Sequence, residues 1–289
     1  MKKCLECGAV YGSSQSACPD CHVAPRIQDG FPAFAPDHVR EEVGFKDEYF
    51  CETAEVEEGH FWFRSRSKLI VWAIAKYCPD VVRFLEVGCG TGFVLSAIAQ
   101  AFPGARLHGS EVLCEGLHRA FSRVPTSNLV QMDARRIPYV DEFDAIGAFD
   151  VLEHIHEDVQ VLRQIHQALR PAGRMFLTVP QHPWLWSSVD NYSFHVRRYA
   201  AKELHEKVRL AGFKVLRSTS FVTALLPLMF GSRRKSGRGG TGAKSRAELN
   251  VHPLLNRIFE AVLGCELWLI RVGLNFPLGG SRLLVAEKA

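Results

Sequence analysis

One stretch, VVRFLEVGCGTGFVLSAIAQAF (residues 81–102), constrains the fold more than any other part of this 289-residue chain. It begins with a strand-like apolar run and places three glycines, Gly88, Gly90 and Gly92, at alternate positions. Apolar residues at helical spacing follow. A strand, a glycine turn and a helix in this order open a nucleotide-binding βαβ unit, because the ligand approaches the backbone where a Cβ atom would collide. The stretch therefore predicts an α/β sheet that holds a ligand over this turn.

The spacing of the glycines and the residue before them separate two classes of ligand. A dinucleotide site uses GxGxxG, which places a pyrophosphate at the helix N-terminus. This loop has GxGxG, and Glu86 stands just before it, where a carboxylate repels a pyrophosphate and can instead hold a cationic ligand or a bound water network. A second predicted strand, 105–112, contains Glu111. It lies about twenty residues beyond the loop, where an acidic residue accepts hydrogen bonds from ribose hydroxyls.

The run EVGCGTG (86–92) resembles motif I of class I S-adenosylmethionine-dependent methyltransferases. Further strands are predicted at 129–138, 143–149, 169–179, 213–221 and 281–288. The resemblance implies a Rossmann-like, seven-stranded doubly wound sheet whose last two strands are antiparallel neighbours. The cofactor-binding positions that it implies are Glu86, Gly88, Cys89, Gly90, Gly92, Glu111, Val112, Asp133, Ala134, Asp150 and Val151.

A segment before the sheet, residues 57–77, reads HFWFR and then continues as an amphipathic helix. It resembles the N-terminal cap that folds over the cofactor in a bacterial subgroup of this family. The resemblance implies that Trp62 covers the methionine part of the cofactor and that Arg64 meets its carboxylate. Ordinary docking of this helix on the sheet is the alternative.

The segment WLWSSVDNYSFHVRRY (184–199), expected as a loop after the fifth strand, is dense in groups that suit a substrate. It resembles the LWS…D…H.RRY…AGF signature of the same subgroup. His195, and His154 after the fourth strand, are predicted as a general base or acceptor-orienting group, because imidazole titrates near working pH. Helix capping and loop hydrogen bonds are their alternative roles. Four further side chains fit either an acceptor contact or a structural role: Trp184, Trp186, Arg197 and Arg198.

The N-terminus carries two CxxC pairs, Cys4/Cys7 and Cys18/Cys21, separated by ten residues. Each pair places two sulfurs on one tight turn, so that two facing turns form a tetrahedral cage suited to Zn²⁺, or else to iron. All four positions are filled by cysteine, which predicts a structural site rather than a catalytic one. Nine cysteines in all, an odd number, fit a reducing, cytoplasmic compartment better than a disulfide framework.

The segment 221–280 separates the last two predicted strands. It contains an apolar piece, a basic Gly/Ser-rich loop (231–246) and an amphipathic helix (254–274). We expect this insert to roof the acceptor site. A dimer face, or peripheral contact with a membrane, is the alternative. No apolar run reaches the roughly 20 residues that a bilayer-spanning helix needs.

Together these features predict three parts: a zinc ribbon (1–26), a linker with cap helices (27–79), and a methyltransferase domain with a helical insert before its last strand (80–289). The predicted function is S-adenosylmethionine-dependent methylation of a small-molecule, lipid-precursor or glycan acceptor. Nucleic-acid methylation with the ribbon as a grip is one alternative. The ribbon is nearly neutral and has only Tyr11 as an aromatic residue, which argues against this alternative. The other alternative is a non-catalytic cofactor-binding scaffold whose ribbon recruits a protein partner.

Overall fold

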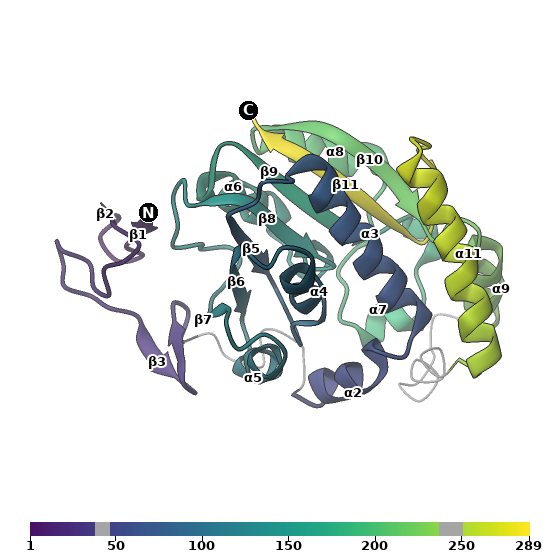
Figure 1. The fold of residues 1–289 in the computed structure, drawn as a ribbon, viewed down its shortest axis with the longest axis horizontal. Coiled ribbons are helices and arrows are strands. Elements are labelled where there is room, and N and C mark those ends of the chain that lie inside the picture. Colours follow the sequence, from purple (N-terminus) through teal and green to yellow (C-terminus); the bar gives the residue numbers. More distant parts are fainter. Residues whose placement is uncertain (38–46, 237–250) are drawn as a thin grey trace.

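The computed structural model describes residues 1–37, 47–236 and 251–289. Within them, nine strands form one sheet in the order β10-β11-β9-β8-β5-β6-β7-β4-β3 (Figure 1). The strands are β3 (Arg26–Gln28), β4 (Phe31–Ala33), β5 (Arg83–Val87), β6 (Arg106–Glu111), β7 (Asn128–Gln131), β8 (Phe143–Phe149), β9 (Leu169–Pro180), β10 (Phe213–Phe221) and β11 (Ser281–Lys288). The five strands from β7 to β9 run parallel, and β11 pairs antiparallel with both β9 and β10. The predicted antiparallel pairing of the last two strands is confirmed.

Helices cover both faces of this sheet because its central strands are apolar on both sides. In β11, Leu283 and Val285 join one hydrophobic core with helices α3, α4 and α5, whereas Leu284 and Ala286 join the other with α6 and α8. This alternation is the period of two that a doubly wound sheet requires. The helices are α2 (Asp47–Glu57), α3 (Phe61–Tyr77), α4 (Phe93–Ala101), α5 (Cys114–Arg123), α6 (Asp158–Ala168), α7 (Ser188–Tyr192), α8 (Ala201–Leu210), α9 (Leu226–Ser236) and α11 (Pro253–Arg271), with one-turn helices η1 (Leu152–His154) and η2 (Pro183–Leu185).

The order of the strands fixes where a ligand binds. The chain winds outward from β5 through β6 to β7 and then returns to the other side of β5 to form β8. The connections after β5 and β8 therefore diverge at the carboxyl ends of these strands. That crevice is the usual ligand site of an open α/β sheet.

The prediction of seven strands is wrong, because a short hairpin extends the edge of the sheet. Strands β3 and β4 fall in the segment expected to be a linker. Ala33 pairs with Gln131 at the end of β7, and the buried Gln131 side chain exchanges hydrogen bonds with the backbone of Ala35. Phe31 is buried in the main core. Strands of three residues are too short to produce a readable period in the sequence.

The cysteine-rich segment forms its own small unit around strands β1 (Lys2–Lys3) and β2 (Val10–Tyr11). It projects at the left of the molecule in Figure 1. The backbone amide of Lys3 donates to the Pro138 carbonyl at 3.0 Å, and Arg136 donates to the Leu5 carbonyl at 3.1 Å. The ribbon is therefore hydrogen-bonded to the connection between β7 and β8.

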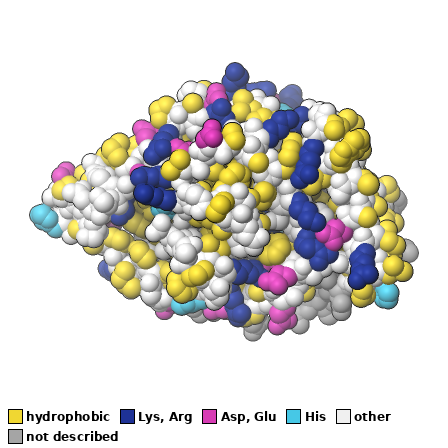
Figure 2. Space-filling model, in the orientation of Figure 1, with side chains coloured by type: hydrophobic (Ala, Val, Ile, Leu, Met, Phe, Trp, Pro, Cys, Tyr) yellow, Lys and Arg dark blue, Asp and Glu magenta, His cyan; other side chains and the backbone are white. Residues whose placement is uncertain are grey.

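The insert supplies two helices, α9 and α11, and most of the predicted basic loop (231–246) lies outside the described residues. Helix α11 packs against α3 through Leu263, Leu267 and Ile270 (Figure 1). Its other side is exposed and apolar, with Leu254 and Trp268 each 62% exposed, and Figure 2 shows hydrophobic side chains along that edge. Among the described residues, no helix has both the length and the apolarity needed to cross a bilayer. Peripheral membrane contact stays a prediction.

Candidate active site

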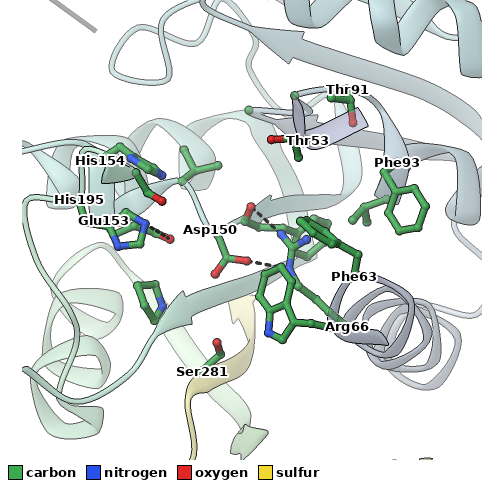
Figure 3. A pocket seen from close by; sticks show the side chains of 18 of the residues that line it. Thr53, Phe63, Arg66, Thr91, Phe93, Asp150, Glu153, His154, His195 and Ser281 are labelled. Carbon is green, nitrogen blue, oxygen red and sulfur yellow. Dashed lines mark hydrogen bonds and ion pairs between the residues drawn. The ribbon is translucent and has the colours of Figure 1, made fainter. Parts of the chain in front are cut away.

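A cavity of about 900 Å³ lies at the carboxyl ends of the central strands (Figure 3). The glycine loop and Glu111 line one end, and residues from η1 and from the segment 193–198 line the other. Helices α2 and α3 cover one side, and the insert contributes Leu228, Met229 and Phe259. Residues of the insert thus line the cavity, while its role as a roof over an acceptor stays a prediction.

The glycines of the loop meet two different requirements. Gly92 has a φ of +76°, and a Cβ there would lie 2.7 Å from the Cα of Ala120, so that the close approach of α5 excludes a side chain. Gly90 has a φ of +51°, yet a Cβ there meets no protein atom within 4 Å. Gly90 lines the cavity with Gly88 and Cys89, whereas Gly92 does not. The open space over Gly90 is what a ligand resting on the backbone requires.

Glu111 lies beside this loop with its side chain held in place. One carboxylate oxygen accepts from the Gly90 amide at 3.1 Å and the other from the Val112 amide at 2.8 Å. Burial raises the pKa of this carboxyl, while these backbone amides oppose the rise. Asp133 and Ala134, after β7, also line the cavity, and Asp133 accepts from Arg135. These residues form a polar wall suited to the ribose and the adenine edge of a nucleoside.

Glu86 is a buried acid in the cavity wall at the end of β5. It is 2% exposed, and among the described residues its Oε2 atom has no hydrogen-bond donor. Burial raises the pKa of this carboxyl to about 8, although the guanidinium of Arg66 opposes the rise. An orphaned acceptor in a cavity wall fits a ligand that carries its own cationic donor. The amino group of S-adenosylmethionine is such a donor, so the residues present fit this cofactor.

The cap places Arg66, rather than Arg64, in the cavity. The Nε atom of Arg66 lies 2.7 Å from Asp150 Oδ2 (Figure 3). The Arg66 guanidinium lies over the Trp62 ring, 5.0 Å from its centre. Trp62 and Asp150 line the cavity as well. Arg64 lies on the opposite side of α3 and pairs with Glu260 of α11. The successive positions of a helix face different neighbours, since each residue turns the side chain by about 100°.

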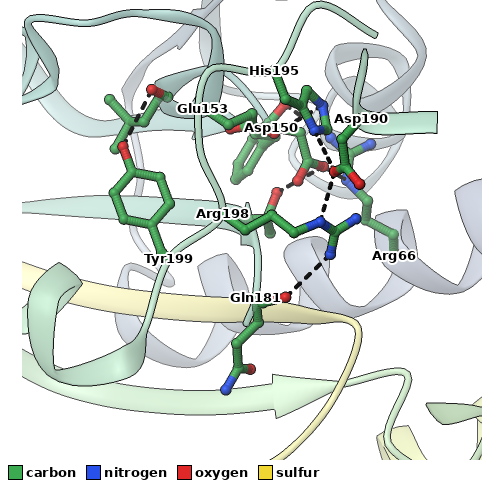
Figure 4. A network of polar contacts seen from close by, with 11 residues as sticks. Arg66, Asp150, Glu153, Gln181, Asp190, His195, Arg198 and Tyr199 are labelled. Carbon is green, nitrogen blue, oxygen red and sulfur yellow. Dashed lines mark hydrogen bonds and ion pairs between the residues drawn. The ribbon is translucent and has the colours of Figure 1, made fainter. Parts of the chain in front are cut away.

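At the other end of the cavity, His195 is backed by a buried carboxylate. Its Nδ1 lies 2.9 Å from Asp190 Oδ1, and that same oxygen accepts from Arg198 Nε at 2.6 Å (Figure 4). The backbone amide of Ser187 donates to the other oxygen of Asp190 at 2.8 Å. Asp190 is 0% exposed. This arrangement fixes the orientation of the imidazole and directs its Nε2 atom toward the cavity.

His154 and Glu153 lie next to His195. The two imidazole rings are 4.8 Å apart, centre to centre, at 72° to each other. Burial and, to a smaller extent, the neighbouring His195 lower the pKa of His154 to about 3. Burial raises the pKa of Glu153 well above its usual range. The sequence analysis identified both histidines as candidate bases or acceptor-orienting groups. It missed Glu153, which adjoins His154 in the chain.

The remaining candidates in 184–199 have structural partners. Arg197 donates to Asp158 at 2.6 Å, outside the cavity lining, and Arg198 lines the cavity while held by Asp190. Trp184 is 53% exposed and stacks on His182. Trp186 donates to Asn191. Neither tryptophan lines the cavity. The segment is also not a simple loop, because it contains η2 and α7.

The cavity also depends on a contact that the sequence patterns did not indicate. Thr91, in the glycine loop, donates to Glu57 at the end of α2 at 2.6 Å, and Arg123 donates to the same Glu57 oxygen at 2.6 Å. Glu57 is 6% exposed. This cluster ties the cap to the loop that it covers. No local signal marks it, because the three residues are far apart in the chain.

The four ribbon cysteines converge. Cys4 Sγ lies 3.5 Å from Cys21 Sγ, and Cys7 Sγ lies 3.6 Å from Cys18 Sγ. All four sulfur atoms lie within 4.8 Å of one another. Tetrahedral zinc–sulfur bonds of about 2.3 Å place sulfurs roughly 3.8 Å apart, so the donor set fits Zn²⁺.

Comparison with known proteins shows which family the chain resembles. A family model described as a methyltransferase domain matches residues 54–218. A Mycolicibacterium smegmatis protein described as a probable S-adenosylmethionine-dependent methyltransferase is 28% identical over 163 residues, which cover 55% of this chain and 61% of that protein's length. O-methyltransferase cnsE of Penicillium expansum is 29% identical over 196 residues, which cover 63% of this chain and 71% of that protein.

Among solved structures, the [4+2]-cyclase SpnF has the same fold, with a TM-score of 0.53 and 22% identity over 78% of this chain and 83% of that one. At this identity the likeness concerns the fold alone. The family model, in contrast, covers more than half of the 289 residues, including the glycine loop and most of the cavity wall. The chain therefore belongs to the methyltransferase domain family of S-adenosylmethionine-dependent enzymes.

Proposed function

We propose that the protein transfers the methyl group of S-adenosylmethionine to a hydroxyl oxygen of a small-molecule, lipid-precursor or glycan acceptor. One observation carries the proposal: a single cavity joins the glycine loop and its acidic residues to an imidazole held by a buried carboxylate. S-adenosylmethionine, when bound, supplies an electrophilic methyl group on a positively charged sulfur. The O-methyltransferase relative supports oxygen as the acceptor atom.

In this proposal the cofactor end of the cavity recognises three parts of the molecule. Glu111 accepts from the ribose hydroxyls, and Asp133 with Ala134 contacts the adenine edge. Glu86 accepts from the amino group, and Arg66, the arginine of the cap that lines the cavity, meets the carboxylate. Trp62, which also lines the cavity, covers the methionine part.

At the acceptor end, we assign the base to His195 rather than to His154. Asp190 accepts from Nδ1 of His195, so that Nε2 is left with a lone pair for the proton of the acceptor hydroxyl. As that oxygen forms its bond to the methyl carbon, the carbon–sulfur bond breaks and its electron pair stays on sulfur. His154, whose pKa is lowered to about 3, remains neutral and serves to position the ring of His195. The cap excludes water from the displacement.

The lining of the acceptor end favours an acceptor with an apolar body. The insert contributes Leu225, Leu228, Met229 and Phe259 to the wall, and the polar lining residues at this end include Glu153, His154, His195 and Arg198. A wall of this kind suits a lipid-like precursor better than a free sugar. We therefore propose a lipid precursor ahead of the other two acceptor classes.

The ribbon completes the proposal as a structural zinc site. Its four sulfurs fit one Zn²⁺, and a closed set of four cysteines leaves no position for catalysis. A unit of about 25 residues buries too little apolar surface to fold without a bound metal ion. Its outer surface is then available to a protein partner. The proposed compartment is the cytoplasm.

Two experiments test the function. The first is calorimetric titration with S-adenosylmethionine, followed by a screen of hydroxylated lipid precursors for S-adenosylhomocysteine formation. Release of that product is needed as the readout, because a cyclase shares this fold. The second replaces His195 by Ala, which should lower turnover about 10²–10⁴-fold and leave cofactor affinity nearly unchanged. Loss of both would assign His195 a structural role, and cofactor binding without any turnover would favour the scaffold alternative.

A further inference from the structure

The acceptor end of the cavity contains one carboxylate more than its arginines balance. Asp150 pairs with Arg66, and Asp190 pairs with Arg198. Glu153 is 0% exposed and lines the same cavity. Within the described parts of the chain, neither of its oxygens accepts a hydrogen bond. An ionised carboxylate buried in this way costs several kcal/mol unless a positive charge compensates it.

Two imidazoles adjoin this unpaired carboxylate. The Oε1 atom of Glu153 lies 4.0 Å from Nε2 of His195, and one donor atom from each of Glu153, His154 and His195 lies within 4.8 Å of the other two (Figure 3). Two imidazoles and a carboxylate are ligands that first-row divalent cations accept. Bonds of about 2.0–2.2 Å place such ligands roughly 3.0–3.5 Å apart, so the three side chains need to close by about 1 Å around an ion.

His195 donates from Nδ1 to a buried carboxylate, as metal-binding histidines commonly do. Asp190 Oδ1 lies 2.9 Å from Nδ1 of His195, which leaves Nε2 as the coordinating atom. Arg198 at 2.6 Å and the Ser187 amide at 2.8 Å hold Asp190 in turn (Figure 4). A carboxylate that accepts from the second imidazole nitrogen orients the ring and raises its basicity as a ligand.

We propose that Glu153, His154 and His195 bind one divalent first-row transition-metal ion at the acceptor end of the cavity. Three protein ligands leave coordination positions open toward the cavity for an acceptor oxygen. The proposal rests on the proposed function only for the identity of that fourth ligand. In the metal-bound protein, Nε2 of His195 coordinates the ion instead of accepting a proton, and the acceptor hydroxyl, whose pKa the ion lowers, loses its proton to solvent as it enters the cavity. The acceptor then has a hydroxyl or carboxylate group that can coordinate the ion.

The test uses Mn²⁺ as the probe and the full chain with its ribbon loaded with zinc. Thiolate cages select zinc, whereas Mn²⁺ prefers oxygen and nitrogen ligands, so the ribbon does not compete. We expect electron paramagnetic resonance titration to find one bound Mn²⁺ per chain. Glu153→Gln should lower this affinity at least about 100-fold, and Asp190→Asn about 10–100-fold. His156→Ala is the matched control, since His156 is exposed and lies outside the triad, and its affinity should equal that of the wild type.

Two results overturn the proposal: no Mn²⁺ bound to the wild type, or equal affinity in the wild type and Glu153→Gln. A rise in the melting temperature of the wild type with Mn²⁺, absent in Glu153→Gln, provides a readout that needs no substrate. Titration of S-adenosylmethionine on the same samples separates the two proposals. Cofactor binding and turnover by a wild type that binds no Mn²⁺ refute the metal site and leave the methyltransferase proposal standing. Metal binding without cofactor binding refutes the methyltransferase proposal and leaves the metal site standing.

Discussion

The unpaired acid at the end of β5 makes cofactor affinity depend on pH. Burial raises the pKa of Glu86 to about 8, so the free protein carries this carboxyl protonated at neutral pH. Compared with an ordinary value of 4.5, this corresponds to roughly 5 kcal/mol of preference for the neutral form. A bound ammonium group favours the ionised form instead, because an opposite charge within hydrogen-bond distance lowers the pKa of a carboxyl. Binding of S-adenosylmethionine should therefore release a proton from Glu86.

The size of this pH effect follows from the linkage between proton release and S-adenosylmethionine binding. Below pH 8 each unit of pH changes the dissociation constant about tenfold, equivalent to about 1.4 kcal/mol. Between pH 5.5 and 7.0 the affinity should rise roughly 25-fold, since the amino group of the ligand stays mostly protonated below its pKa of about 7.7–8.0. Above pH 8 the affinity should fall as that amino group loses its proton. The sign is fixed: the free protein binds more protons than the complex, so raising the pH favours the complex.

Isothermal titration calorimetry in buffers of different ionisation enthalpy measures both the affinity and the number of protons released. Glu86→Gln keeps the shape of the side chain and should make the affinity independent of pH over 5.5–7.0. Methylthioadenosine keeps the nucleoside and lacks the ammonium, so it reports any contribution from Glu111, whose pKa is also raised by burial. The reasoning is refuted if methylthioadenosine follows the same slope, or if Glu86→Gln keeps the pH dependence of the wild type.

Three further predictions concern the loop, the core and the ribbon. Gly92→Ala should lower the free energy of unfolding by about 1–3 kcal/mol, because its Cβ would collide with α5, whereas Gly90→Ala should weaken cofactor binding more than stability; urea unfolding and calorimetry compare the two. Tyr199→Phe removes a buried hydrogen bond of 2.7 Å to Asp158 and should cost about 1–2 kcal/mol in urea unfolding, since Arg197 and Lys207 still donate to the same carboxylate oxygen. Cys18→Ser should lose the zinc found by elemental analysis; retention of one zinc per chain would contradict the assignment of the ribbon site.

Most residues predicted at the cofactor end line the cavity, because the signals that mark them are local. The alternation of apolar residues, the GxGxG spacing and an acid at the end of each of two strands all lie within short stretches of chain. The sheet brings Glu86, Gly90 and Glu111 together because β5 and β6 are parallel neighbours in register. The strand from Phe143 to Phe149 and the strand from Ser281 to Lys288 have the predicted bounds for the same reason.

In the cap, the local sequence pattern was insufficient to predict which arginine lines the cavity. The sequence placed two arginines, Arg64 and Arg66, on one helix, and only the rotation of α3 against the sheet decided which of them lines the cavity. The hairpin at Phe31 was missed for a related reason, since its strands are stabilised by the edge of β7 rather than by their own residues.

The sequence by itself determined the class of fold, the ligand over the glycine turn and the four sulfurs of the ribbon, because each depends on residues that are close in the chain. Tertiary structure alone decided how the acceptor end is built. Glu153 and His154 follow β8, while His195 and its partner Asp190 come from a segment some forty residues later. Hydrogen bonds from the Val196 amide to the Glu153 carbonyl and from Arg198 to the Gln181 carbonyl hold this segment against the ends of the strands, and no spacing in the chain specifies these contacts.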